Sequence, residues 1–179
     1  MQLFSKWASR EHPLGLRIAV LALAAILFLY LLPLAVIGGG SSLDRQFGLP
    51  ALDLGAANYL LGGALAVLGL FFAFWSIGDQ VTRGRGTPLP MLPTQELLTQ
   101  GPFRYCRNPM TLGTILAYSG LGVVAGTLSG IGLVLCFGAL LILYLKVIEE
   151  KELAERFGDA YLAYKREVPF MLPRLPKRD

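Results

Sequence analysis

The chain has 179 residues, of which 54% are apolar and only 16% are charged. Soluble domains carry about 25% charged residues, so this composition excludes an ordinary soluble domain and indicates a single membrane domain over residues 1–179. The net charge of +4 follows from the bias of basic residues toward the cytoplasmic side of membrane proteins, and we do not interpret it as nucleic-acid binding.

Three stretches contain no charged residue, and each is long enough to cross a bilayer: residues 18–43, 54–78 and 108–145. The third has 38 residues, which as one helix would reach about 57 Å, nearly twice a hydrocarbon core of about 30 Å. We therefore expect it to be a hairpin. The sequence predicts an all-α polytopic membrane protein with transmembrane helices at about residues 15–38, 55–77, 109–127 and 130–148.

The first stretch follows Lys6, Arg10 and Arg17, an arrangement that secretory signals share. Its apolar run far exceeds the roughly 7 to 15 residues of a signal core, so we expect a retained helix. Pro33 lies inside this stretch and predicts a kink, because proline removes one hydrogen bond of the helix.

Residues 79–107 form a polar loop with prolines at positions 88, 90 and 93. Aromatic and apolar residues are spaced through it, so we expect an ordered segment with a function. Gly84 and Gly86 have two interpretations, a simple turn or a close approach of the backbone to a ligand.

Arg107, Asn108 and Pro109 stand where the third helix begins. Proline suits the first position of a helix, and asparagine suits the capping position before it. A second interpretation is compatible with the first: free N–H groups and the positive end of the helix dipole would bind a carboxylate or another anionic group.

The hairpin must reverse within residues 120–130, where glycine and serine supply turn conformations. We place its tip at residues 127–130. The alternative interpretation of these glycines is close packing between helices in the membrane.

Glu149 and Glu150 follow the fourth helix, and a hairpin returns its two ends to the same side of the membrane. We therefore expect this pair to lie near Asn108. The two carboxylates are either solvated at the membrane surface or bind ribose hydroxyls or an amino group of a ligand.

Residues 149–179 are expected to form a cytoplasmic amphipathic helix and a tail. One apolar stripe is predicted on this helix at Leu153, Phe157, Tyr161, Tyr164 and Val168. The stripe either lies on the bilayer or folds over the loop at 79–107 as a lid. Pro169 and Pro173 are expected to end the helix.

Orientation follows from the basic residues, because cytoplasmic segments carry the excess of lysine and arginine. Residues 1–17, 79–107 and 146–179 hold all of the 16 basic residues except Arg45. Both termini are therefore expected on the cytoplasmic side. The two cysteines, Cys106 and Cys136, imply no disulfide framework, and with His12 as the only histidine we expect no metal site.

Three separated motifs carry a resemblance to a known family. Residues 101–113 read Gly-Pro-Phe-Arg-Tyr-Cys-Arg-Asn-Pro-Met-Thr-Leu-Gly, Glu149-Glu150 follow, and residues 157–169 read Phe-Gly-Asp-Ala-Tyr-Leu-Ala-Tyr-Lys-Arg-Glu-Val-Pro. In order and spacing they resemble the isoprenylcysteine carboxyl methyltransferase and phospholipid methyltransferase superfamily, over roughly residues 84–173.

The resemblance implies an S-adenosylmethionine-dependent methyltransferase that takes a lipid or isoprenoid-like acceptor from the membrane and methylates a carboxylate, an amine or a thiol. Carried over by position, the cofactor-binding residues are Gln95, Glu96, Leu97, Leu98, Phe103, Asn108, Pro109, Met110, Thr111 and Glu149. Supporting positions are Arg107, Gly113, Lys146 and Glu150. No catalytic residue is assigned, and the oligomeric state is left open.

Some positions depart from the family pattern. Asn108 and Thr111 stand where members often have histidine and tyrosine. Leu145 stands where the eukaryotic carboxyl methyltransferases have a substrate-orienting arginine, and Lys146 is its nearest replacement. Two other functions remain as alternatives: a reductase of the related sterol reductase type, for whose nicotinamide cofactor 179 residues leave little room, and a non-catalytic lipid-binding membrane protein.

Overall fold

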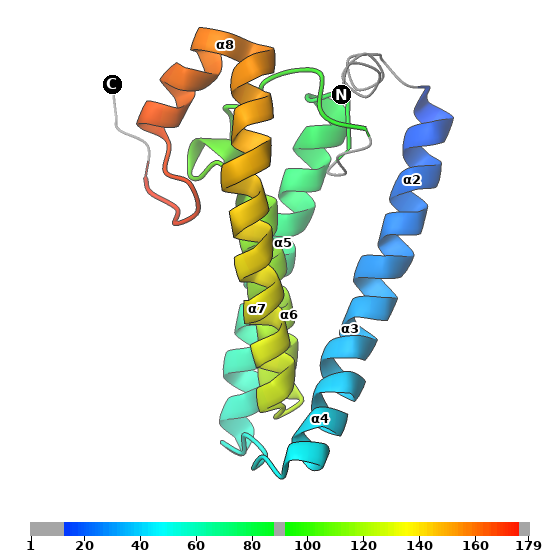
Figure 1. Ribbon diagram of the computed structural model, residues 1–179. Helices are drawn as coiled ribbons and strands as arrows, with labels where there is room; N and C mark the ends of the chain where they lie inside the picture. The colour runs from blue at the N-terminus through cyan, green and yellow to red at the C-terminus, as the bar shows by residue number, and fades with distance from the viewer. Residues whose placement is uncertain (1–12, 88–91, 176–179) are drawn as a thin grey trace.

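The computed structural model describes residues 13–87 and 92–175 (Figure 1). His12, Pro88 and Pro90 lie outside the described residues. Throughout the described part of the chain the regular secondary structure is helical, which confirms the predicted all-α class. Four long helical segments run along one another (Figure 1). Short connections join the first segment to the second and the third to the fourth, whereas residues 83–108 separate the second from the third.

The first segment is a continuous helix from Leu14 to Phe47 with two π-helical interruptions. It consists of α2 (Leu14–Ile26), η1 (Leu27–Leu31), α3 (Leu32–Leu34), η2 (Ala35–Gly39) and α4 (Gly40–Phe47). The expected end near residue 38 was too early, because the polar residues that follow remain helical. Gly48 ends the helix with a φ of 62°, a left-handed conformation that favours glycine.

The other segments are α5 (Ala56–Thr82), α6 (Pro109–Val124) and a third that begins with α7 (Leu128–Tyr144). This last one continues through η4 (Leu145–Glu149) into α8 (Glu150–Glu167). Within the described residues, three segments are long and apolar enough to cross a membrane, and α6, with 16 residues, is a shorter apolar helix. The chain is therefore a multi-pass membrane protein.

The hairpin of α6 and α7 turns slightly earlier than expected. α6 ends at Val124 and α7 begins at Leu128, so the tip lies at residues 125–127. Gly126 takes a φ of 66° in this turn, and the Thr127 hydroxyl accepts a hydrogen bond from the Gly130 amide at 3.1 Å. Thr127 thus caps α7, while Gly130 belongs to the helix itself.

Glycines allow α5 and α6 to pack backbone against backbone. A Cβ atom added at Gly69 would lie 2.5 Å from the Gly113 carbonyl oxygen, and one added at Gly120 would lie 2.5 Å from that of Gly62. The contacting glycines are seven residues apart on both helices, so they share one face of each. Small residues at such interfaces are typical of membrane helices, where packing rather than hydrophobicity drives association.

Buried polar side chains close the end of the bundle away from α8. Asp44 accepts hydrogen bonds from the Thr127 hydroxyl at 2.6 Å and from the Ser129 amide at 2.8 Å. The Asn58 amide donates to the carbonyls of Leu52 at 2.6 Å and Val123 at 3.0 Å. The bonds of Asp44 join the first helix to the start of α7, and those of Asn58 join α5 to the preceding loop and to the end of α6. They satisfy groups that helix ends leave unpaired.

The opposite end, which we call the α8 end, carries the loop before α6 and the C-terminal segment. Gly84 and Gly86 approach their own chain, because an added Cβ atom would lie 2.7 Å and 2.5 Å from atoms of Thr94. This favours the turn interpretation. The Gln95 amide also donates to the Gly84 carbonyl at 2.6 Å, so this part of the loop is internally bonded.

The predicted single stripe on the C-terminal helix is interrupted. Gly158 has φ 55° and ψ −133°, which breaks α8 into two helical pieces. The second piece folds back toward the loop, where the Tyr164 hydroxyl donates to the Phe103 carbonyl at 2.7 Å. In the first piece, Arg156 donates to the Thr94 carbonyl at 2.6 Å. The helix therefore covers the loop, as the lid interpretation expects, with a bend that only glycine adopts readily.

Residues 168–174, which we call the C-terminal strap, run beside residues 105–107. The Arg107 amide donates to the Pro169 carbonyl at 2.9 Å, and the Arg174 amide donates to the Tyr105 carbonyl at 3.0 Å. The strap thereby fixes the backbone directly before α6.

The close packing of α5 and α6 predicts that Gly113→Ala destabilises the fold. The new methyl group would meet backbone atoms of Gly69 and Ala73 at 2.5 and 2.6 Å, and such overpacking costs about 1 to 3 kcal/mol. Thermal unfolding of the purified protein in detergent measures the effect. Gly132→Ala is the matched control, since no atom lies within 4 Å of its added Cβ. Equal unfolding temperatures for the two variants would contradict this packing.

Candidate functional site

A cavity of about 350 Å³ opens at the α8 end and continues between the first helix and the α6–α7 hairpin. Its size falls within the range of about 300 to 1,000 Å³ that holds small-molecule ligands. Polar residues line it near the start of α6 and the end of η4. Apolar residues line the part that runs along the first helix, so the cavity has a polar end and an apolar arm.

Of the 14 positions that the resemblance assigns to cofactor binding or support, eleven line this cavity: Glu96, Leu97, Leu98, Phe103, Arg107, Asn108, Pro109, Met110, Thr111, Glu149 and Glu150. They come from the loop before α6, from the first turn of α6, and from the junction of η4 and α8. The hairpin brings Asn108 and Glu149 to one cavity although 41 positions separate them in the sequence.

Gln95, Gly113 and Lys146 are not among the lining residues. The Gln95 side chain donates to the Pro93 carbonyl at 2.9 Å within the loop. Gly113 lies against α5, where its role is packing. The Lys146 ammonium lies 5.0 Å from the centre of the Phe170 ring, so it contacts the C-terminal strap.

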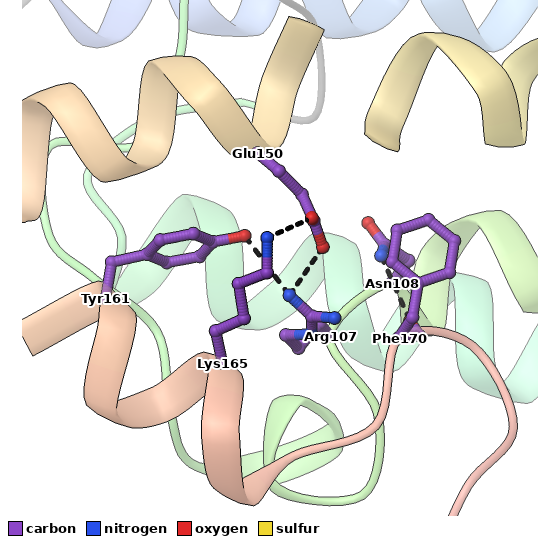
Figure 2. A network of polar contacts seen from close by, with 6 residues as sticks. All are labelled: Arg107, Asn108, Glu150, Tyr161, Lys165 and Phe170. Carbon is purple, nitrogen blue, oxygen red and sulfur yellow. Dashed lines mark hydrogen bonds and ion pairs between the residues drawn. The ribbon is translucent and has the colours of Figure 1, made fainter. Parts of the chain in front are cut away.

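Asn108 occupies the capping position of α6, but its side chain does not cap the helix. The amide nitrogen donates instead to the Phe170 carbonyl at 3.0 Å, as Figure 2 shows. The expectation of a side-chain cap was wrong, because the strap offers a nearby carbonyl for the amide. The first amide groups of α6, which the Asn108 side chain does not bind, lie at the wall of the cavity.

The two glutamates leave α7 through a π-helical turn. The Glu150 amide donates to the Leu145 carbonyl five residues earlier, which widens the helix at this point. Both carboxylates line the cavity although they are adjacent in the sequence. The wider turn allows this, since neighbouring residues of a regular helix point about 100° apart.

Glu150 is neutralised by two cations. Its carboxylate lies 2.5 Å from Arg107 Nη1 and 2.6 Å from Lys165 Nζ, and Arg107 also donates to the Tyr161 hydroxyl at 3.5 Å (Figure 2). The contact with Arg107 is a close ion pair that lacks the direction of a good hydrogen bond. Glu150 therefore holds the start of α6 against both pieces of α8.

Glu149 has a different environment. It follows the apolar part of α7, lines the cavity, and is half-buried. Burial, and secondarily the charges of Glu152 and Glu150, raise the pKa of Glu149 to about 7. The carboxylate that Arg107 and Lys165 neutralise is its neighbour Glu150. A positively charged ligand at this end of the cavity would stabilise the ionised form of Glu149.

Cys106 lies at the same end but is fully buried. Burial raises the pKa of its thiol to about 11, so the thiol is protonated near neutral pH and is a poor nucleophile. Burial also raises the pKa values of Tyr161 and Tyr164, so both phenols stay protonated. The Tyr164 hydroxyl donates to the Phe103 carbonyl, and the Tyr161 hydroxyl accepts from Arg107.

The sequence did not single out the apolar arm. The first helix contributes Phe28, Ala35 and Val36, and α6 and α7 contribute Tyr118, Val134 and Phe137 among others. Apolar residues in membrane helices give no signal that separates a cavity wall from a lipid-facing surface. Tyr118 carried a usable signal, because a phenol within an uncharged span requires a hydrogen-bond partner.

Comparison with known proteins adds an independent observation. Residues 57–160 match the family model described as phospholipid methyltransferase, which covers more than half of the chain. The match begins in α5 and ends in α8, so it includes Asn108, Glu149 and Glu150 at the polar end of the cavity but neither Tyr161 nor Tyr164. No curated protein matches the chain.

Proposed function

The chain belongs to the phospholipid methyltransferase family, and we propose that it methylates a membrane lipid whose reacting group enters the cavity at its polar end. Family membership makes the protein an S-adenosylmethionine-dependent methyltransferase. The proposal concerns which residues bind the cofactor, where the acceptor lies, and on which side of the membrane the site opens.

The observation that carries the proposal is that one cavity holds both a group that binds cations and a group that binds anions. Arg107 and Lys165 pair with Glu150, so the Glu149 carboxylate can bind a cation. The start of α6, where the Asn108 side chain does not cap the helix, offers amide hydrogens and the positive end of the helix dipole. S-adenosylmethionine has matching groups, since its amino acid part carries an ammonium and a carboxylate. The residues present therefore fit the cofactor.

We assign the binding roles accordingly. Glu149 would accept hydrogen bonds from positively charged or hydroxyl groups, and the amides of Met110 and Thr111 would donate to the carboxylate. Leu97, Leu98 and Phe103 form an apolar wall beside them, suited to the flat adenine ring. Asn108 presents its carbonyl oxygen as an acceptor, because its amide nitrogen is engaged with Phe170.

The cofactor supplies a methyl group on a positively charged sulfur, which is already activated toward an electron-rich atom. The protein then contributes by alignment and by exclusion of water. α8 covers the polar end through Leu153, Phe157 and Tyr161, which all line the cavity. Because α8 closes the polar end of the cavity, an apolar acceptor would enter the cavity from the bilayer.

The apolar arm provides that approach. It runs between the first helix and the hairpin, and its walls are Phe28, Val36, Val134 and Phe137 together with further aliphatic residues. We propose that the acceptor's chain lies in this arm while its amine, carboxylate or thiol reaches the polar end. A phospholipid fits this division into an apolar chain and a polar head.

We further propose that the α8 end is cytoplasmic and that the chain crosses the bilayer four times. Within the described residues, every basic residue except Arg45 belongs to segments at this end, and basic residues favour the cytoplasmic side. Both termini would then be cytoplasmic, on the side where soluble S-adenosylmethionine is available.

Methyl transfer to extractable lipid tests the function. Protein in nanodiscs that contain phosphatidylethanolamine is incubated with methyl-labelled S-adenosylmethionine, and label in the organic phase is counted. We expect lipid-borne label that falls at least tenfold in Glu149→Gln and is retained in Glu155→Gln, an exposed carboxylate on the same helix. Prenylcysteine and apolar thiols serve as further acceptors. Cofactor binding without transfer to any of these acceptors would contradict the proposal.

The raised pKa of Glu149 predicts pH-dependent cofactor affinity. A cationic ligand favours the carboxylate, so the pKa of Glu149 falls on binding and a proton is released. Below about pH 7 Glu149 is protonated in the free protein and must lose this proton before the cofactor binds. The dissociation constant of the cofactor should therefore rise by up to about tenfold for each pH unit by which the pH is lowered. Calorimetric titration between pH 6 and 8 measures the slope. In Glu149→Gln any remaining pH dependence comes from groups other than Glu149, including those of the cofactor. If affinity changes with pH as steeply in this variant as in the unmodified protein, the role of Glu149 is refuted.

A further inference from the structure

A hydrogen bond joins the first helix to α6 within the apolar part of the protein. The hydroxyl of Tyr118 donates to the carbonyl oxygen of Phe28. Both residues line the cavity, at the level of its apolar arm. This contact, which we call the Tyr118 latch, crosses the gap through which a lipid chain would enter.

The local sequence of the first helix explains why the Phe28 carbonyl is free to accept this bond. In η1 the Leu32 amide donates to the Leu27 carbonyl, five residues earlier. In the same register the Phe28 carbonyl faces the nitrogen of Pro33, which carries no hydrogen. An unpaired carbonyl within a bilayer is costly, and the phenol of Tyr118 supplies the missing donor.

The latch lies where the first helix separates from the bundle. Toward the far end, Asp44 bonds to Thr127 and Ser129, and Gly40 packs directly against Gly130. Toward the α8 end, α2 stands apart from α5, α6 and α7 (Figure 1). The side chains of Leu23 and Ile26 there are 69% and 56% exposed, as expected for a helix that leaves its neighbours.

The first helix is thus bonded to α7 at the end away from α8, whereas its α2 part has few contacts with the other helices. The hydrogen bond between Tyr118 and Phe28 lies where α2 begins to separate from the other helices, so it limits how far α2 can move from the α6–α7 hairpin. Because the apolar arm lies between Phe28 and Val36 on one side and Val134 and Phe137 on the other, that distance determines the width of the arm.

We propose that Tyr118 determines which acceptors enter, by holding the first helix at a spacing that restricts the bulk of the lipid chains beside the hairpin. This inference rests on the proposed function, because it assumes that acceptors arrive through the apolar arm. Tyr118 acts here as a positioning residue: it sets the place of the first helix and does not contact the reacting atoms.

Photolabelling in nanodiscs tests the selectivity without depending on methyl transfer. The probes are phosphatidylethanolamines with a diazirine in an acyl chain, one with a single chain and one with two, and adducts are mapped to residues 128–145. In Tyr118→Phe the two-chain to one-chain ratio should rise about threefold or more, the scale of one hydrogen bond in a membrane. Tyr30→Phe is the matched control, since this tyrosine lies on the first helix, two residues after Phe28, and is 65% exposed.

A distance measurement follows the helix itself. Spin labels at Leu23→Cys and Leu143→Cys, introduced after replacement of Cys106 and Cys136, report the separation of α2 from α7. Both labelled positions are exposed and neither lines the cavity. We expect a longer and broader distance distribution in Tyr118→Phe, and no change in Tyr30→Phe.

Should Tyr118→Phe not fold, Pro33→Ala tests the latch from the other side, because it provides an amide that competes for the Phe28 carbonyl. The same rise in the labelling ratio is then expected. An unchanged ratio in a folded latch variant, or an equal rise in Tyr30→Phe, overturns the inference, whether or not the helix moves. Failure of lipid methylation alone would instead count against the proposed function.

Discussion

The ion pair between Arg107 and Glu150 is the contact on which the arrangement of the site depends. It joins Arg107, two residues before α6, to Glu150, the residue after η4, and Lys165 extends it to the folded-back piece of α8. Because the two side chains are largely buried, with only 11% and 12% of their surface exposed, loss of either partner would leave the other charge poorly solvated, at a cost of about 3 to 5 kcal/mol. Because Glu150 takes both cations, the adjacent Glu149 keeps a carboxylate for a ligand.

The membrane imposes the second constraint, since every backbone group within it must find a partner inside the protein. The hairpin of α6 and α7 meets this requirement and at the same time returns Asn108 and Glu149 to one face. The polar end of the cavity consequently lies at the boundary of the apolar segments, where a soluble cofactor and a lipid can meet. The first helix, which the family match does not include, supplies one wall of the apolar arm.

The sequence could predict the features that follow from charge and length. Uncharged stretches indicated the helices, and the excess length of residues 108–145 indicated the hairpin and so the meeting of Asn108 with Glu149. Contacts made by the strap and by free carbonyls could not be predicted, because any carbonyl can accept. The amide of Asn108 binds Phe170 rather than α6, and the bend at Gly158 depends on a backbone conformation that composition does not reveal.

The central claim is that the start of α6 and the end of η4 bind one ligand together. A double-mutant cycle with Asn108→Ala and Glu149→Gln, measured as affinity for S-adenosylmethionine, tests it without knowledge of the methyl acceptor. If both residues contact the bound cofactor, the losses should be non-additive, with a coupling of about 0.5 to 3 kcal/mol. Additive losses, or an Asn108→Ala variant that unfolds at lower temperature but binds the cofactor as tightly as the unmodified protein, would contradict the account.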